Sequence, residues 1–269
     1  MASFSVVSNL ASINAQSNLT QTNLGLNKAL TRLSSGLRIN YSGDDAAGLA
    51  VANQYRSDVA ILNQGVRNAN DGLSVLQIKD GALNNISTLL DRLATLATQA
   101  SSTSNGVDVT KLSDEYGQII NEITRQATVG GLSGTTSFSV FVSSETTVSD
   151  GVITDSSIGG ATAANLGLTT TSFTTAAQAQ TALTQVTAAI DTLGDVQNEV
   201  GILENKLAFA ISLAQSQVVN TKAAESRIRD ANIAEESANL TRFNILSQSG
   251  IAALAQANQS SSYVLSLLR

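Results

Sequence analysis

Apolar residues recur at every third or fourth position through a long stretch of the first half of the chain, and the 269 residues contain no proline. This spacing places apolar side chains along one face of an α-helix, and proline is the residue that most strongly interrupts helices. The repeating positions are Val59, Leu62, Val66, Ala69, Leu73, Leu76, Leu83, Leu90, Ala94 and Ala97. A helix from Asp44 to about Ala100 would be about 80 Å long at about 1.5 Å per residue, which is too long for one compact domain.

Two further helices are predicted after a turn at residues 101–106, where serine, asparagine and glycine gather. A shorter helix is expected from about Val109 to Thr128, and a long one from about Ala176 to Asn232. Apolar residues of the long segment again recur every three or four positions: Leu183, Val186, Ile190, Leu193, Val200, Leu203 and Leu207. Aromatic residues, which usually dominate the burial of a compact core, make up only 4% of the chain. The narrow seam of an antiparallel helical bundle suits this composition better.

Residues 131–175 differ from the rest of the chain because they are rich in serine and threonine. Apolar and polar residues alternate in Ser137–Val142 and again in Val152–Thr154, on either side of Asp150-Gly151. Alternation around Asp-Gly indicates a β-hairpin. The alternative is a flexible Ser/Thr linker between two helices.

Both ends of the chain carry apolar residues at helical spacing but no charge. Lys28 is the first charged residue, and no charged residue lies between Phe243 and Arg269. Because an exposed helix normally carries charges on its outer face, we expect these ends to be buried on several sides by copies of the same chain. The residues predicted to form this polymerisation surface are Leu10, Ile13, Leu26, Leu30, Leu33, Leu37, Leu240, Phe243, Ile251, Leu254, Val264 and Leu267. The alternative is that both ends are frayed tails of a bundle.

The predicted fold class is therefore mainly α. It combines a long antiparallel helical rod or coiled-coil bundle, a small β-hairpin region and paired N- and C-terminal helices.

Neither histidine nor cysteine occurs in the chain. The commonest general base and metal ligand is therefore missing, and so is any thiolate. We predict no enzyme activity, no catalytic residue, no cofactor and no metal.

The net charge of −6 without a basic patch argues against nucleic acid binding. No run approaches the ~20 apolar residues of a membrane span, and the N-terminus does not resemble a cleaved signal peptide, which leaves another export route open.

Adjacent carboxylates occur at Asp44-Asp45, Asp114-Glu115 and Glu235-Glu236. Neighbouring residues on a helix point in directions about 100° apart, so this spacing does not make a catalytic pair. We expect Asp44 and Asp45 to stabilise the start of the long helix through its dipole.

Two motifs at opposite ends of the chain resemble the signatures of bacterial flagellins. The first combines Leu33–Asn40 (LSSGLRIN) with Asp44–Ala50 (DDAAGLA). The second begins at Ser226–Ala234 (SRIRDANIA) and continues through Leu254–Gln259 to Val264–Arg269. The resemblance covers about residues 1–130 and 176–269.

The resemblance implies a structural subunit that is secreted through the flagellar type III apparatus and self-assembles into the filament used for swimming. It implies a D0 domain, which lines the inner tube, and a surrounding D1 domain. The implied boundaries are 1–43 for the N-terminal D0 helix and its connecting spoke, 44–130 for two D1 helices, 131–175 for the β region, 176–232 for the D1 return helix and 233–269 for the C-terminal D0 helix. Implied partners are copies of the chain, an export chaperone and the filament cap and junction proteins.

The resemblance also implies a surface that vertebrate Toll-like receptors recognise and that doubles as a contact between protofilaments. Alignment places it at Arg92, Leu96, Gln99 and Glu115. Two positions that often carry an arginine and a glutamate in recognised members are Ala94 and Thr95 here. Because polar partners are lost, we expect weak receptor activation.

Two alternatives remain at this point. A hook–filament junction protein shares the terminal helices and would differ in its copy number per filament. A soluble coiled-coil adaptor would carry charged outer faces on the terminal helices. Separately, the Ser/Thr-rich segment 133–175 is a candidate for O-glycosylation, which the intact mass of the native protein would reveal.

Overall fold

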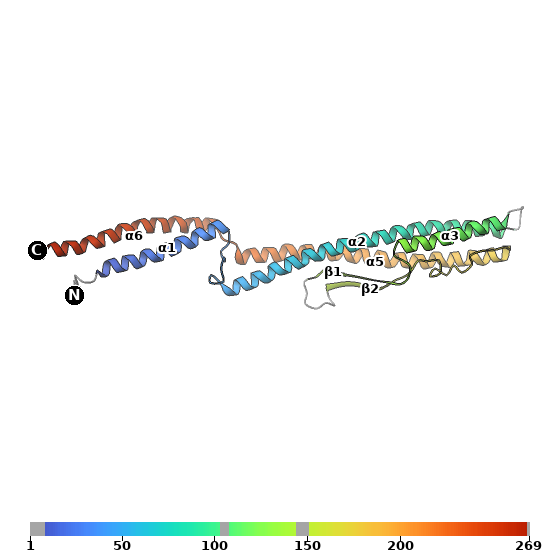
Figure 1. Ribbon diagram of the computed structural model, residues 1–269, viewed down its shortest axis with the longest axis horizontal. Coiled ribbons are helices and arrows are strands. Elements are labelled where there is room, and N and C mark those ends of the chain that lie inside the picture. Colours follow the sequence, from blue (N-terminus) through green and yellow to red (C-terminus); the bar gives the residue numbers. More distant parts are fainter. Residues whose placement is uncertain (1–8, 103–107, 144–150, 268–269) are drawn as a thin grey trace. The chain divides into compact units, whose positions relative to one another are not determined.

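The computed structural model describes residues 9–102, 108–143 and 151–267, with backbone alone for 155–157 and 260–267. The described residues form five helices and two strands (Figure 1). The helices are α1 (Leu10–Ser35), α2 (Ala46–Ser101), α3 (Val109–Val129), α5 (Ala176–Arg229) and α6 (Ile233–Leu267). The strands are β1 (Thr136–Phe141) and β2 (Val152–Ile158). This confirms the predicted fold class. Among the described residues, no helix combines the length and the apolar character that a membrane crossing requires.

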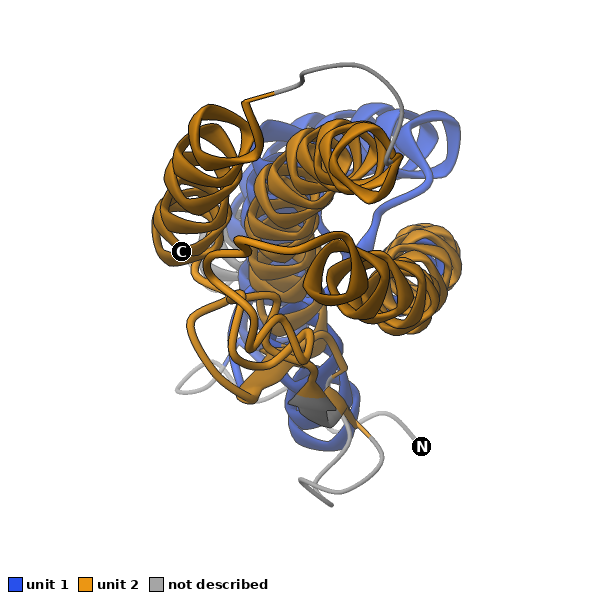
Figure 2. Cartoon of the chain, turned by 90° about the vertical axis from the view of Figure 1, so that its right-hand side faces the viewer, with its two compact units in different colours: residues 1–57, 220–269 blue, residues 58–219 orange. Residues whose placement is uncertain are grey.

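The chain divides into two compact units, which Figure 2 colours separately. Unit 1 comprises residues 1–57 and 220–269, and unit 2 comprises residues 58–219. Both long helices, α2 and α5, therefore contribute residues to each unit. The D0 and D1 boundaries stay a prediction.

The core of unit 2 is a narrow apolar seam between α2, α3 and α5, and the hairpin packs on it. The buried positions of α5 include both alanines and larger aliphatic residues: Ala179, Ala182, Val186, Ala189, Leu193, Val196, Val200, Leu203, Leu207 and Ala214. The predicted stripe of this helix included Ile190, which is in fact 39% exposed, while its neighbour Ala189 is fully buried. The seam accepts alanine at these positions because the helices approach closely, as expected for a core with few aromatics.

The Ser/Thr-rich segment folds against the bundle and is not a flexible linker. β1 pairs antiparallel with β2, with a register shift between Thr136 and Phe138. Asp150 of the predicted turn lies outside the described residues. Beyond β2, Phe173 is 1% exposed, its ring meets Tyr116 edge-on at a centroid distance of 5.2 Å, and its N–H donates to Ser113 Oγ at 2.9 Å. Burial of an aromatic ring anchors the loop that leads into α5.

The hairpin packs on α2 at two glycines one heptad apart, Gly65 and Gly72, here called the glycine seat. A Cβ at Gly65 would lie 2.3 Å from the carbonyl oxygen of Val142, and one at Gly72 would lie 2.8 Å from Cγ2 of Val140. The backbone of the hairpin can therefore lie directly on the helix only because these positions have no side chain.

A buried lysine joins α2 to the segment between α3 and β1. Lys79 is 7% exposed, and its Nζ donates to the carbonyl oxygen of Gly131 at 2.6 Å and to Thr136 Oγ1 at 3.4 Å. Burial lowers the pKa of this ammonium group. The hydrogen bonds to the segment that follows α3 offset part of that desolvation.

The glycine seat predicts the effect of Gly65→Ala. The added methyl group would meet backbone atoms that cannot rotate away, so the free energy of unfolding should fall by about 1–3 kcal/mol. Gly81→Ala is the matched control, because Gly81 lies in the same helix with nothing within 4 Å of its missing Cβ. The control should raise the free energy of unfolding by up to about 1 kcal/mol through helix propensity. Urea titration followed by circular dichroism measures both, and equal effects of the two variants would refute the seat.

The buried hydroxyl of Tyr116 leads to a prediction for the stability of Tyr116→Phe. The side chain is fully buried, burial raises its pKa to about 12, and Oη has no hydrogen-bond partner among the described residues. Removing a buried hydroxyl without a partner removes its desolvation cost. Tyr116→Phe should therefore leave stability unchanged or raise it by about 1 kcal/mol, as measured by urea titration. A loss of more than that amount would contradict the unpaired hydroxyl.

Candidate interaction surface of the terminal helices

The terminal helices α1 and α6 of unit 1 pack against each other along a heptad seam. The seam positions are spaced alternately by three and four residues and are buried or half-buried. On α1 they are Ser12, Ala15, Leu19, Thr22, Leu26, Ala29 and Leu33. On α6 they are Glu236, Leu240, Phe243, Ser247, Gly250, Leu254 and Ala257. This is the spacing of a two-stranded coiled coil.

Two glycines let the helices approach, one from each helix. A Cβ at Gly25 of α1 would lie 2.6 Å from the ring of Phe243, and a Cβ at Gly250 of α6 would lie 3.2 Å from Leu19 Cδ1. Each large side chain therefore packs against a glycine of the opposite helix. Side-chain hydrogen bonds add to the pairing, including Ser247 Oγ to Asn23 Oδ1 at 3.3 Å.

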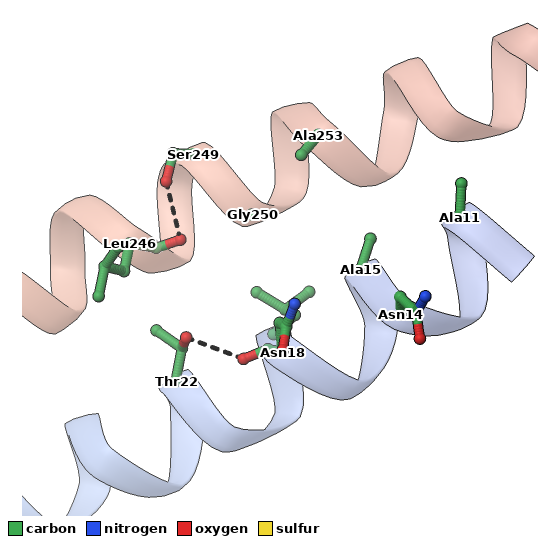
Figure 3. A pocket seen from close by; sticks show the side chains of 10 residues that line it. Ala11, Asn14, Ala15, Asn18, Thr22, Leu246, Ser249, Gly250 and Ala253 are labelled. Carbon is green, nitrogen blue, oxygen red and sulfur yellow. Dashed lines mark hydrogen bonds between the residues drawn. The ribbon is translucent and has the colours of Figure 1, made fainter.

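A groove of about 500 Å³ runs between the two helices beside this seam (Figure 3). Short side chains from both ribbons line it, among them Ala15 and Thr22 of α1 and Ala253 of α6. Its hydroxyl groups bond within their own helices: Thr22 Oγ1 donates to the carbonyl of Asn18 at 2.9 Å, and Ser249 Oγ to that of Leu246 at 3.1 Å. These hydroxyls can be covered without losing a hydrogen bond.

The seam leaves much apolar surface uncovered. Among the described residues of the two helices, only Ala29 and Glu236 are buried. Several large apolar side chains outside the seam and the groove are more than 40% exposed: Leu10, Ile13, Leu24, Leu30, Ile233, Ile245 and Ile251. The surface around them carries no charge up to Lys28 on α1 or beyond Arg242 on α6.

The predicted polymerisation residues therefore separate into groups. The seam contains Leu26, Leu33, Leu240, Phe243 and Leu254, whereas Leu10, Ile13, Leu30 and Ile251 face outward. Val264 and Leu267 lie near the end of α6, where side chains are outside the described residues. The strict heptad from Ser12 to Leu33 is the sequence signal that distinguishes the buried Ala29 from the exposed Leu30.

Leu37 corrects the predicted extent of the first helix, whose apolar spacing was expected to continue to this residue. The helix ends at Ser35 because Gly36 adopts φ 71°, a left-handed cap whose N–H donates to the carbonyl of Arg32 at 2.9 Å. Glycine is the residue that best tolerates this conformation. Leu37 then pairs with Asp230 in an isolated antiparallel bridge.

This bridge joins the two signature motifs through their backbones. Arg38 N–H donates to the carbonyl of Arg229 at 2.7 Å, and Ala231 N–H donates to that of Gly36 at 2.9 Å. The pairing holds the segments that precede α2 and follow α5 beside each other. Sequence analysis did not anticipate it, because the two motifs are almost 200 positions apart and their pairing leaves no local pattern.

Residues 36–45, here called the connector, join α1 to α2. Two ion pairs hold the connector and α6 against the last turns of α1. Lys28 Nζ lies 2.8 Å from Asp44 Oδ1, and Arg32 Nη1 lies 3.0 Å from Glu236 Oε1. Asp44 Oδ2 also accepts N–H bonds from Asn40 at 3.2 Å and Tyr41 at 3.4 Å. The bond from Lys28, followed by that from Asn40, lowers the pKa of Asp44 to about 2.

The adjacent carboxylates Asp44 and Asp45 thus have different tasks. Asp45 Oδ1 accepts the N–H of Gly48 at 2.9 Å and caps the start of α2, as the sequence predicted. Asp44 instead holds the connector, which the charge pattern alone did not reveal.

The residues aligned with the receptor surface lie on α2 and α3 in unit 2. Arg92 donates from Nη2 and Nε to Glu115 Oε1 at 2.6 and 3.1 Å, and Gln99 is exposed. The resemblance implies an exposed Leu96, and this is wrong for the single chain, because Leu96 is 1% exposed. It continues the apolar stripe three residues after the buried Leu93 and therefore points into the bundle.

Comparison with known proteins gives concordant matches. Residues 6–139 match the bacterial flagellin N-terminal helical region, and residues 177–268 match the bacterial flagellin C-terminal helical region. A flagellin of Halalkalibacterium halodurans is 35% identical over 97% of this chain and 98% of that protein. A flagellar filament 33 kDa core protein of Treponema phagedenis is 34% identical over the same shares. A crystal structure of Bacillus cereus flagellin aligns with a TM-score of 0.46 and 29% identity, over 59% of this chain and 94% of that one.

The Asp44 contacts predict a pH-dependent stability. Its pKa falls from 3.8 to about 2 on folding, so its contribution is complete above about pH 4 and is lost as the pH falls toward 2. Asp44→Asn should therefore lower the melting temperature at pH 7, and the difference from the unmodified chain should vanish near pH 2. Thermal melts followed by circular dichroism measure this difference. Asp91→Asn, an exposed position on α2, is the control and should have little effect at pH 7; a difference for Asp44→Asn that persists at pH 2 would contradict the assignment.

Proposed function

We propose that this chain, which belongs to the bacterial flagellin family, assembles with copies of itself through the outward faces of α1 and α6. The chain is a structural subunit of the flagellar filament and not an enzyme. The observation that carries the proposal is the row of exposed leucines and isoleucines on the stretches of α1 before Lys28 and of α6 beyond Arg242, which carry no charge. A surface of this kind in a water-soluble chain is typical of an interface.

Burial of this surface leaves few polar groups without a hydrogen bond. The threonines of the terminal helices donate to carbonyls of their own helix, as in Thr20 to Gln16 and Thr241 to Ser237, both at 2.9 Å. Packing a neighbouring helix over such groups removes apolar area from water and leaves no hydroxyl unpaired. An interface that joins different faces of successive copies grows into an open helical array.

The D0 and D1 division belongs to the same proposal. Residues 1–43 and 233–269 would form D0 around the inner tube, and 44–130, 131–175 and 176–232 would form D1. The α1–α6 seam supports this division, because two helices alone bury one face each and leave the other for neighbouring copies.

Export and further partners are also proposed from the family. They comprise secretion through the type III apparatus, an export chaperone, and the cap and junction proteins at the filament ends. Weak recognition by a vertebrate Toll-like receptor is proposed through Arg92, Gln99 and Glu115. The ion pair between α2 and α3 brings Arg92 and Glu115 together. A reporter-cell assay in which the purified monomer has full potency would contradict the predicted weakness.

Seeded elongation tests the polymerisation surface. Leu24 is 64% exposed on the outward face of α1, and Leu24→Glu would bury a charge at every interface that covers this face. We expect the concentration needed for growth on filament fragments to rise at least roughly tenfold, which corresponds to about 1.4 kcal/mol. Light scattering and negative-stain microscopy follow the growth.

Val129→Glu is the matched control, since Val129 is 71% exposed at the end of α3 in unit 2. It introduces the same charge at a similarly exposed apolar position and should change growth much less. Failure of the unmodified chain to elongate any seed would overturn the proposed assembly, and equal inhibition by both variants would remove the assignment to α1.

A further inference from the structure

One ion pair joins a seam position of α6 to the half-buried Arg32, which lies beside the otherwise uncharged seam of the terminal helices. Glu236 is a seam position of α6 and is only 8% exposed, and its Oε1 accepts from Arg32 Nη1 at 3.0 Å. Every other seam position from Ser12 to Leu33 and from Leu240 to Ala257 is uncharged.

Removing the charges of this pair from water costs free energy. Arg32 Nε is buried and has no acceptor within the part of the chain that the structure describes. Replacing a buried ion pair by apolar residues of similar size is often neutral or stabilising, whereas removing one partner leaves a charge in a dry site. The best-attested use of such a pair is to fix the register of neighbouring helices.

The spacing along the seam shows which registers the pair opposes. Arg32 faces Glu236 and Gly25 faces Phe243, and in each helix these positions are seven residues apart. A slip of seven residues would keep the heptad pattern aligned. It would also place Glu236 opposite Gly25 in one direction, or Phe243 opposite Arg32 in the other.

Either slip leaves one charged group buried without its partner. The only other cation of α1 is Lys28, which already pairs with Asp44 at 2.8 Å, and no charged residue of α6 follows Arg242 before its end at Leu267. The packing of Phe243 on Gly25 and of Leu19 on Gly250 also opposes a slip, and the ion pair adds an electrostatic preference to this steric one.

We propose that Arg32 and Glu236 specify the register in which α1 and α6 pair. The inference rests on the proposed function, because identical contacts throughout a filament require the outward leucines of α1 and α6 to have the same relative position in every copy. The backbone bonds of the connector, such as Arg38 to Arg229 at 2.7 Å, lie next to the pair and are the competing determinant of register.

Disulfide trapping tests the proposal, and the chain is suited to it because it contains no cysteine. Asn23→Cys with Ser247→Cys reports the native register, since these side chains are in contact at 3.3 Å. Asn23→Cys with Leu240→Cys, and with Leu254→Cys, report slips of seven residues in the two directions. A glutathione buffer lets the disulfides equilibrate, and non-reducing gels give the ratio of native to slipped product.

We expect the native pair to exceed each slipped pair by roughly tenfold in the unmodified seam, and Arg32→Met with Glu236→Leu to reduce this ratio about fivefold. The exchanged pair, Arg32→Glu with Glu236→Arg, should restore most of the ratio even if the apolar variant packs poorly. Glu122→Leu with Arg125→Met removes an exposed pair on α3 and should leave the ratio unchanged.

An unchanged ratio in the apolar variant, or no recovery in the exchanged variant, would assign the register to the connector and the glycine contacts and overturn the proposal. The ratio is measured within single chains and needs no filament. Failure of the unmodified chain to elongate seeds would therefore overturn the proposed assembly while the register ratio still decides this inference.

Discussion

Two helices that pack along a single seam cannot cover more than one face of each, and the rest of unit 1 follows from this geometric limit. The heptad between α1 and α6 brings alanines, glycines and a few leucines into contact and leaves most of them half-buried, so the contact is close but narrow. Helical stability in water depends mainly on such tertiary burial. Because charge is excluded from most of both helices, the exposed remainder is suited to contact with protein rather than with solvent.

Unit 2 shows how the same small residues allow a different arrangement. Gly65 and Gly72 let a hairpin pack directly on α2, and Tyr116 with Phe173 supplies one of the few aromatic contacts. The bundle is therefore completed by strands and a loop on one side. The absence of proline and the low aromatic content both agree with a core of this narrow form.

Local periodicity predicted most of the secondary structure, because each long helix repeats its apolar face many times. It placed the helix starts near Asp44, Val109 and Ala176 and the strands on either side of Asp150. It was weaker where two faces of one helix are both apolar. Leu30 and Ile190 satisfied the three-and-four spacing but point outward, and the adjacent alanines are buried in their place.

Non-local features could not be read from the chain in the same way. The pairing of Leu37 with Asp230, the contact of Asp44 with Lys28 and the burial of Lys79 each depend on segments that meet only in the fold. Family resemblance supplied the function but also implied an exposed Leu96, which the packing of this chain does not allow.

The hydroxyl groups that bond to their own helix have a thermal consequence. If assembly covers apolar surface and exchanges few hydrogen bonds, its driving force near room temperature is largely the entropy of released water. Such an association has a negative heat-capacity change and weakens on cooling. Because threonines such as Thr22 and Thr241 keep their hydrogen bonds within their own helix, the association between subunits should strengthen on warming and weaken on cooling.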